Sequence, residues 1–99
     1  MAGVVVDGDL CSGHGCWPPR RNIGCSSDVF IGGKGAVRVG DAWETHCCPS
    51  IPECHSSYQL TGSPNVFVNG LAMARVGDLI ACGSVNVSGQ GVEAKVFCN

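Results

Sequence analysis

The chain carries three histidines and eight cysteines among its 99 residues, and four of these side chains are placed where they could hold a metal. Two histidines and one cysteine follow a Gly-Asp pair, at five, five and four residues after the aspartate, and the third histidine lies in an irregular segment. These candidate ligands are His14, His46, Cys82 and His55. Zinc prefers four tetrahedral nitrogen and sulfur ligands, and three imidazoles with one thiolate fill that shell. The set predicts a structural zinc ion without an open position for catalysis, although imidazole also suits iron.

Other interpretations of the same residues stay open from spacing alone. Cys47, Cys48 and Cys54 lie close to histidines and could replace the thiolate of the candidate set. No Cys-x-x-Cys pair with zinc-finger spacing is present, which disfavours an all-cysteine cluster. A zinc hydrolase would need an open coordination position and a general base beside the metal, for which Glu44 and Glu53 are the candidates.

An internal repeat must position these ligands. Residues 28–41 read DVFIGGKGAVRVGD and residues 65–78 read NVFVNGLAMARVGD, with half of the fourteen paired positions identical. In the second copy, Asn69-Gly70 is the strongest two-residue hairpin signal, because both positions accept positive φ. Gly32-Gly33 takes the same place in the first copy. Each copy therefore predicts a hairpin that ends at its Gly-Asp pair. The returning strands are expected at 37–39 and 73–76.

A third copy is expected to be split between the two ends of the chain. The start, VVVDGDL, supplies the Gly-Asp pair, and the end, GSVNVSGQGVEAKVF, echoes GSPNVFVNG at 62–70. We expect its turn at 89–91, its next strand at 92–97, and the two termini close together. The predicted fold is mainly β: a small conical domain of three pseudo-three-fold β-hairpin repeats with long loops and little helix. It forms one domain over residues 1–99, with the third repeat closed by the terminal segments.

Two long segments interrupt the repeats and hold all three histidines. Residues 10–25 and 46–61 are rich in proline and cysteine, and neither shows strand or helix periodicity. Loops of this length in a compact domain are usually functional or anchored by something. We expect a helical turn only at 42–45 or 79–81.

Composition and the lack of certain motifs argue against several classes of function. A net charge of -2 with 14% charged residues leaves no basic patch for a phosphate backbone, so no nucleic-acid partner is expected. There is no run of about eighteen apolar residues that could span a membrane. Neither a Gly-x-Ser-x-Gly elbow nor a phosphate-binding loop is present. The N-terminus lacks a signal-peptide pattern, which predicts synthesis in the cytoplasm and exit by a route that reads no cleaved signal.

The cysteine content allows two interpretations. Eight cysteines could form up to four bridges in a secreted disulfide-rich binding module. Without a signal peptide, reduced thiols and metal binding are favoured, with several cysteines acting as small buried apolar side chains. Cys47 and Cys48 could not easily bond to each other, because they are neighbours in the chain.

Charged and aromatic residues near the repeats are interpreted structurally. Arg38 and Arg75 each lie three residues before the aspartate of a Gly-Asp pair. We expect them to form ion pairs that brace the turns, in preference to forming a binding surface. Trp17 and Trp43 are expected to cover a small core.

These residues resemble the PAAR-repeat proteins, which are named for the tetrapeptide Pro-Ala-Ala-Arg. The segment GSPNVFVNGLAMARVGD at 62–78 is similar to that motif, with Ala72-Met73-Ala74-Arg75 at the tetrapeptide position. The copy at 28–41 has Gly35-Ala36-Val37-Arg38 there and is more divergent. The resemblance covers nearly the whole chain.

Members of that family are small conical proteins that cap a trimeric β-helical spike, either a valine-glycine repeat protein of a type VI secretion system or the central spike of a phage baseplate. The resemblance implies one tip per spike trimer, a structural and non-enzymatic role in piercing a target membrane, and a zinc ion near the vertex. Carried over by position, the ligands of that zinc are His14, His46, His55 and Cys82. The resemblance also implies secretion with the injection machine or residence in the virion tail, as a bare tip without an effector domain.

Overall fold

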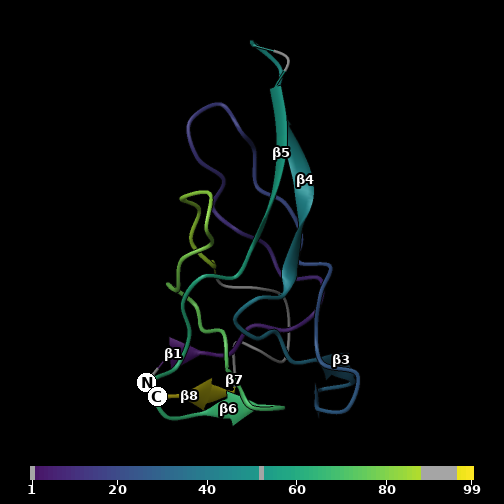
Figure 1. The fold of residues 1–99 in the computed structure, drawn as a ribbon, viewed down its shortest axis with the longest axis vertical. Helices are drawn as coiled ribbons and strands as arrows, with labels where there is room; N and C mark the ends of the chain where they lie inside the picture. Colours follow the sequence, from purple (N-terminus) through teal and green to yellow (C-terminus); the bar gives the residue numbers. More distant parts are fainter. Residues whose placement is uncertain (1, 52, 88–95) are drawn as a thin grey trace.

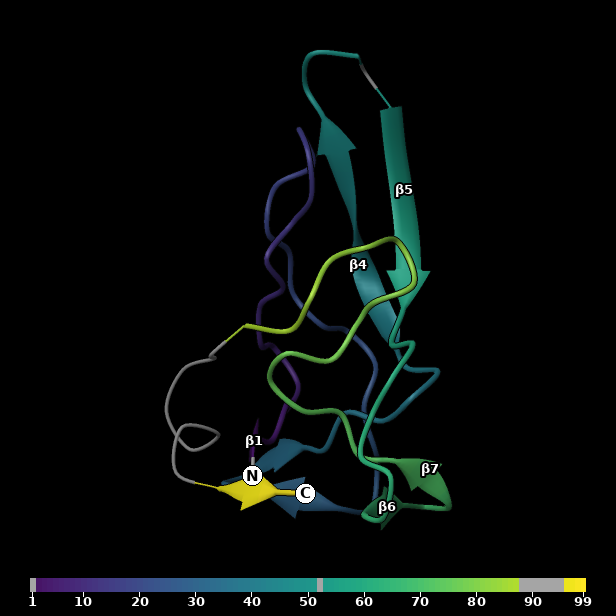
Figure 2. The same ribbon diagram turned by 90° about the vertical axis from the view of Figure 1, so that its left-hand side faces the viewer.

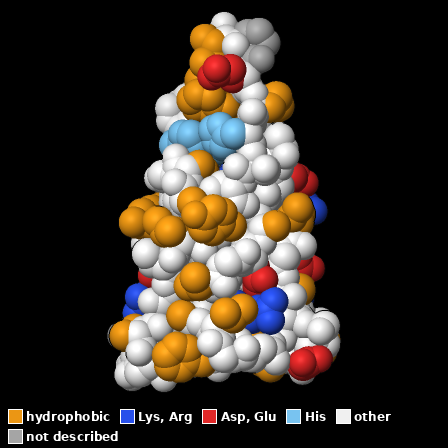
Figure 3. All heavy atoms as spheres, in the orientation of Figure 1, with side chains coloured by type: hydrophobic (Ala, Val, Ile, Leu, Met, Phe, Trp, Pro, Cys, Tyr) orange, Lys and Arg blue, Asp and Glu red, His pale blue; other side chains and the backbone are white. Residues whose placement is uncertain are grey.

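The computed structural model describes residues 2–51, 53–87 and 96–99. They form a tapered body of 38 × 24 × 22 Å, wide at one end and narrow at the other (Figures 1 and 3). Its strands pair into four two-stranded antiparallel sheets. The strands are β1 (Ala2–Gly3), β2 (Phe30–Ile31), β3 (Lys34–Gly35), β4 (Ala42–Cys48), β5 (Glu53–Tyr58), β6 (Phe67–Val68), β7 (Leu71–Ala72) and β8 (Phe97–Cys98). The prediction of a small, mainly β domain is confirmed.

Three of the sheets are short hairpins that form the wide end, which we call the base (Figures 1 and 2). β6 and β7 are joined by Asn69 and Gly70, with φ of 52° and 79°. β2 and β3 are joined by Gly32 and Gly33, with φ of 61° and 84°. Both two-residue turns lie where the sequence predicts them, because both central residues must tolerate positive φ.

The third hairpin of the base is closed by the two ends of the chain. β8 pairs with β1, with Ala2 opposite Cys98 and Gly3 opposite Phe97. The predicted proximity of the termini is confirmed. The register of the third copy is corrected, however. Phe97 lies in the first strand of this hairpin and not at the end of a returning strand, because β1 itself is the return. The turn expected at 89–91 and most of the strand expected at 92–97 lie outside the described residues.

The returning strands of the repeats pair with one another around a pseudo-three-fold axis. Isolated bridges join Val4 to Arg75, Val6 to Ala36 and Arg38 to Met73, which links the three segments 4–6, 36–38 and 73–75. At their centres, the N–H of Val5 donates to the carbonyl of Ala74 at 3.1 Å, Ala74 to Val37 at 2.9 Å, and Val37 to Val5 at 3.0 Å. The three residues are fully buried. The strands expected at 37–39 and 73–76 therefore pair across repeats, and Met73 also extends its own hairpin by donating its N–H to the Val66 carbonyl at 2.9 Å.

A second layer of core residues lies on this ring, again with one residue per unit. Cys11, Trp43 and Ile80 pack with Val5, Val37 and Ala74 in one buried cluster. Bridges connect these three residues to the polar residues Asn86, Asn22 and Gln59. The indole N–H of Trp43 donates to the Gln59 side-chain oxygen at 3.1 Å. The expectation that Trp43 belongs to the core is confirmed, because its ring is buried and its polar atom has a partner.

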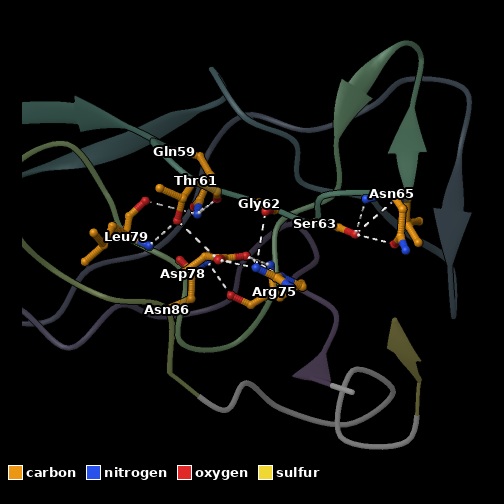
Figure 4. Close-up of polar contacts among 10 residues, drawn as sticks. Gln59, Thr61, Gly62, Ser63, Asn65, Arg75, Asp78, Leu79 and Asn86 are labelled. Atoms are coloured by element: carbon orange, nitrogen blue, oxygen red, sulfur yellow. Dashed lines mark hydrogen bonds and ion pairs between the residues drawn. The ribbon is translucent and has the colours of Figure 1, made fainter. Parts of the chain in front are cut away.

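Each unit then ends in the same aspartate-capped turn, shown for one unit in Figure 4. The Asp78 carboxylate accepts from the Arg75 backbone N–H at 2.8 Å and from the Arg75 guanidinium at 2.9 and 3.0 Å. Arg38 and Asp41 repeat this arrangement, which confirms the predicted ion pairs. In the third unit the carboxylate of Asp9 accepts from the backbone N–H of Val6. Val6 takes the place that arginine has in the other two units.

One predicted loop is largely regular structure. Residues 46–61 contain the end of β4 and the whole of β5, which together form a hairpin that rises to the narrow end (Figure 2). The helical turn proposed at 42–45 is wrong, because these residues lie in β4. Residues 79–81 are also not helical, since Leu79 and Ile80 form bridges. Among the described residues there is no helix, and thus none able to cross a membrane.

Candidate metal centre

Each structural unit sends one side chain from the core toward the narrow end. His14 follows Cys11 by three residues, His46 follows Trp43 by three, and Cys82 follows Ile80 by two. Because these core residues pack in one buried cluster, the side chains that follow them can lie close together. Figure 3 shows histidine side chains grouped on the narrow half of the molecule.

The fourth candidate, His55, reaches the group through a strand pairing. It lies on β5 directly opposite His46 on β4, in a register that brings their side chains to the same face. No residue of the other repeats corresponds to His55 in sequence. Its place in the group is explained by the β4–β5 hairpin, which pairs it with His46.

The four candidate ligands form one compact donor set. The Nε2 atoms of His46 and His55 lie 2.6 Å apart, and those of His14 and His55 lie 3.0 Å apart. With the Cys82 Sγ, the four ligand atoms all lie within 4.8 Å of one another. His46 is buried, and the other three are partly buried. The structure therefore brings together all four residues that the sequence nominates.

This donor set fits a tetrahedral zinc ion. With zinc–nitrogen bonds of about 2.0–2.1 Å, two imidazole nitrogens of a tetrahedron lie roughly 3.3 Å apart. The measured separations of 2.6 and 3.0 Å need only small outward movements of the rings. Three neutral imidazoles and one thiolate would leave a net charge of +1 and fill the shell. The chain thus offers the nitrogen and sulfur atoms that zinc prefers, while iron is also compatible with imidazole.

Hydrogen bonds around the set hold the ligands in metal-binding form. The Nδ1 of His46 lies 2.8 Å from the Pro18 carbonyl, a contact that places the proton on Nδ1 and leaves Nε2 free to bind. The Arg20 guanidinium donates to the Cys82 sulfur at 2.8 Å. Arg20 is buried, and its Nε has no hydrogen-bond partner among the described residues. Sequence analysis missed both residues, since neither Pro18 nor Arg20 belongs to a repeat position.

The local electrostatics favour the same protonation states. Burial lowers the pKa of His14, and the charges of His55 and Arg20 lower it further. Burial also lowers the pKa of His46. Burial raises the pKa of the Cys82 thiol, but hydrogen bonds with Ser84 and the charge of Arg20 outweigh this effect and leave that pKa below its ordinary value. Neutral imidazoles and a thiolate are the forms that bind metal.

The ring of Trp17 packs against the imidazole cluster. Its ring stacks on His14 with centroids 5.2 Å apart and lies 4.9 Å from the ring of His55. Its indole N–H donates to the Glu53 carbonyl at 3.1 Å. The expectation that Trp17 covers a small core is therefore wrong, because its ring lies on the candidate metal ligands and belongs to neither hydrophobic cluster.

Two disulfides take up the cysteines that compete with Cys82 for a place in the donor set. Cys16 bonds to Cys48, and Cys47 bonds to Cys54. The expectation that the cysteines are reduced is thus wrong for these four, because the β4–β5 register places Cys47 opposite Cys54 and the fold brings the distant Cys16 to Cys48. The competing ligands Cys47, Cys48 and Cys54 are consumed by these bonds. Cys82 remains as a free thiol within the donor set.

A zinc hydrolase would need one of two glutamates beside the donor set as a general base. Neither Glu44 nor Glu53 belongs to the donor set, and both are exposed. No pocket opens among the residues that the structure describes.

Comparison with known proteins gives one finding about the family. The family model described as PAAR motif matches residues 2–88, most of the chain. Among curated proteins, none matches this sequence.

Proposed function

The chain belongs to the PAAR-motif family, which is associated with the spike tips of type VI secretion and related contractile machines, and we propose that it is such a tip. In this proposal it seats on the blunt end of a trimeric β-helical spike, one copy per trimer, and stiffens its own point with a bound zinc ion. The spike would be a valine-glycine repeat protein or a phage central spike.

The observation that carries this proposal is a ring of exposed phenylalanines on the base. Phe30, Phe67 and Phe97 occupy the same position in the three short hairpins. They are 59%, 59% and 52% exposed. Large apolar side chains exposed in one region mark an interaction surface. A single chain that repeats this residue three times around its axis suits a partner with true three-fold symmetry.

Short open hairpins supply the second reason for a docking base. One strand of each hairpin is bonded to the neighbouring unit, because the carbonyls of Gly35, Ala72 and Gly3 accept from the N–H groups of Asp7, Val39 and Val76. Among the described residues, the other strands, β2, β6 and β8, have no backbone hydrogen bond outside their own two-stranded sheet. Such edges invite pairing with another chain and are normally covered. The blunt end of a β-helix also carries unpaired backbone groups, so the two surfaces could cover each other.

The metal would do structural work at the opposite end. The narrow end is too thin for a hydrophobic core of its own, and the buried clusters lie nearer the base. Structural zinc contributes on the order of 10–16 kcal/mol of apparent folding energy in small peptides, which is comparable with a total stability of about 5–15 kcal/mol for a domain. Because four protein ligands fill the shell, we propose a rigid point and no enzymatic activity.

The remaining parts of the proposal follow from the role of a tip. The chain would be made in the cytoplasm and leave it with the injection machine or as part of a virion tail. It would meet a target membrane transiently and would not bind nucleic acid. The driving energy would come from contraction elsewhere in the machine.

The test is the stoichiometry of the complex with the cognate trimeric spike. Size-exclusion chromatography with light scattering should give a mass of one tip per three spike chains. A complex with three tips per trimer, or no complex at all, would refute the docking proposal.

The two disulfides favour a second candidate function, a secreted disulfide-rich binding module. Such a module would need neither a metal nor a trimeric partner. A chain that lacks bound metal, ignores the spike and keeps both disulfides would support this candidate over the tip.

A further inference from the structure

The two disulfides are placed beside the candidate metal ligands. Cys16 lies two residues after His14, Cys47 directly follows His46, and Cys54 directly precedes His55. No disulfide involves the segment that carries Cys82. The disulfides therefore join the segments that carry the three histidines, and the segment that carries Cys82 is not crosslinked.

The Cys47–Cys54 bond fixes the relation between His46 and His55. The two cysteines face each other across β4 and β5, in the pair next to the histidine pair. An isolated two-stranded hairpin is marginally stable in water, and a slip of one residue would turn its side chains to the other face. A covalent bond one position away from the two imidazoles prevents that slip.

The Cys16–Cys48 bond fixes the third histidine against the same hairpin. Cys48 belongs to β4, whereas Cys16 belongs to the segment that carries His14, and the two are separated by 32 residues in sequence. Around His14 that segment is held locally by two mutual backbone hydrogen bonds with Trp17. The long-range bond to β4 thus keeps the His14 imidazole near the other two.

We propose that the two disulfides form a redox-controlled scaffold that assembles the three histidines before a metal arrives, so that the site of three histidines and one cysteine belongs to the oxidised chain. This inference rests on the metal centre of the proposed function. Each bond forms when two thiols lose two electrons and two protons to a small disulfide oxidant, which leaves as two thiols. A dithiol reductant reverses each bond by exchange. In a reducing compartment the scaffold is open, and it closes when the chain reaches an oxidising one.

In the oxidised chain, metal binding costs less conformational entropy than in the reduced chain. When the segments are already joined, the ion does not have to order three separate stretches of chain, and preorganisation of this kind raises affinity. In the reduced state, four additional thiols lie near the ion. Some of them can replace an imidazole, because thiolates are good zinc ligands.

The test compares zinc affinity with and without the crosslinks. The four-fold variant Cys16→Ser, Cys47→Ser, Cys48→Ser and Cys54→Ser adds no competing thiols and keeps the four ligands. Competition with a chromophoric chelator should show affinity about 10–100-fold below that of the oxidised wild type, the scale for lost outer support of a metal site. The control variant Cys25→Ser with Cys98→Ser alters two free cysteines away from the centre, and its affinity should equal that of the wild type.

A cobalt-loaded sample reports the ligands directly. The oxidised wild type and the four-fold variant should both show the charge-transfer absorption of one thiolate, whereas the chemically reduced wild type should show more. If the four-fold variant binds zinc as tightly as the wild type, the scaffold proposal is wrong, whereas the proposed metal centre is still supported. A wild type that binds no zinc overturns both.

A second measurement uses the unaltered chain and remains informative if the variant does not fold. The Trp17 indole N–H is bonded to the Glu53 carbonyl, so its hydrogen exchange reports whether the loop and hairpin stay together. After metal removal with a chelator, exchange should stay slow in the oxidised chain and become at least about tenfold faster once the disulfides are reduced. Equal exchange in the two metal-free forms would overturn the proposal.

Discussion

Replacement of one phenylalanine of the base tests the docking proposal quantitatively. Phe67 is 59% exposed on β6. An aromatic side chain of roughly 200 Å² thus leaves about 120 Å² to be covered by a partner. At about 25 cal/mol per Å², covering it contributes close to 3 kcal/mol. We therefore expect Phe67→Ser to weaken binding to the trimeric spike roughly 100-fold.

The three-fold repeat makes this prediction specific. Phe30 and Phe97 take the same place in the other two hairpins and are similarly exposed. Their serine variants should therefore lose affinity to within about threefold of the Phe67 variant, because about 0.6 kcal/mol separates effects of that ratio. Titration calorimetry or biolayer interferometry with the immobilised spike would give all three constants.

A matched control sits at the opposite end of the molecule. Ile51 is 51% exposed in the connection between β4 and β5, so Ile51→Ser removes a comparable apolar surface away from the base. It should leave the spike affinity unchanged. If Ile51→Ser weakens binding as much as Phe67→Ser, or if only one of the three phenylalanines matters, the three-fold docking argument is wrong.

Three further predictions concern the fold and the metal-free state. Asp78→Ala removes the carboxylate that receives the Arg75 backbone and guanidinium, and should lower the free energy of unfolding by about 2–4 kcal/mol in urea; a loss below about 1 kcal/mol would contradict the bracing role. Trp43→Ala empties a site that is 1% exposed and should cost about 3–5 kcal/mol, with an unchanged melting temperature as the contrary result. Burial lowers the pKa values of His14 and His46, so the folded metal-free chain binds fewer protons at these sites than the unfolded chain. Its thermal stability should be highest above about pH 6.5 and fall as the pH drops through the lowered values; histidines that stabilise the fold on protonation would reverse this trend.

Local turn chemistry explains what the sequence could predict. Asn69-Gly70 and the Gly-Asp pairs specify their conformations within two to four residues, so two hairpins and the capped turns were readable directly. The similar spacing after these turns, at five, five and four residues, then located His14, His46 and Cys82. Three of the four members of the donor set therefore followed from local rules and the internal repeat.

Long-range pairing explains what the sequence could not predict. β5 has no alternating apolar pattern, because the hairpin it forms with β4 is held by a disulfide and packs little hydrophobic surface. Its register with β4 is what brings His55 to the centre. Arg20 and Pro18 act through contacts to distant residues and leave no local signal. The true start of the third unit at Phe97 was hidden because its hairpin is completed by β1 from the other end of the chain.

The central claim is that three repeated units gather their ends around one closed metal site. X-ray absorption at the metal edge, on oxidised protein purified without added metal, tests it most directly. The account predicts one zinc per chain with three nitrogen ligands at about 2.0–2.1 Å and one sulfur ligand at about 2.3 Å. A protein without metal, or a metal that keeps a water molecule in place of Cys82 or one of the three histidines, would contradict it.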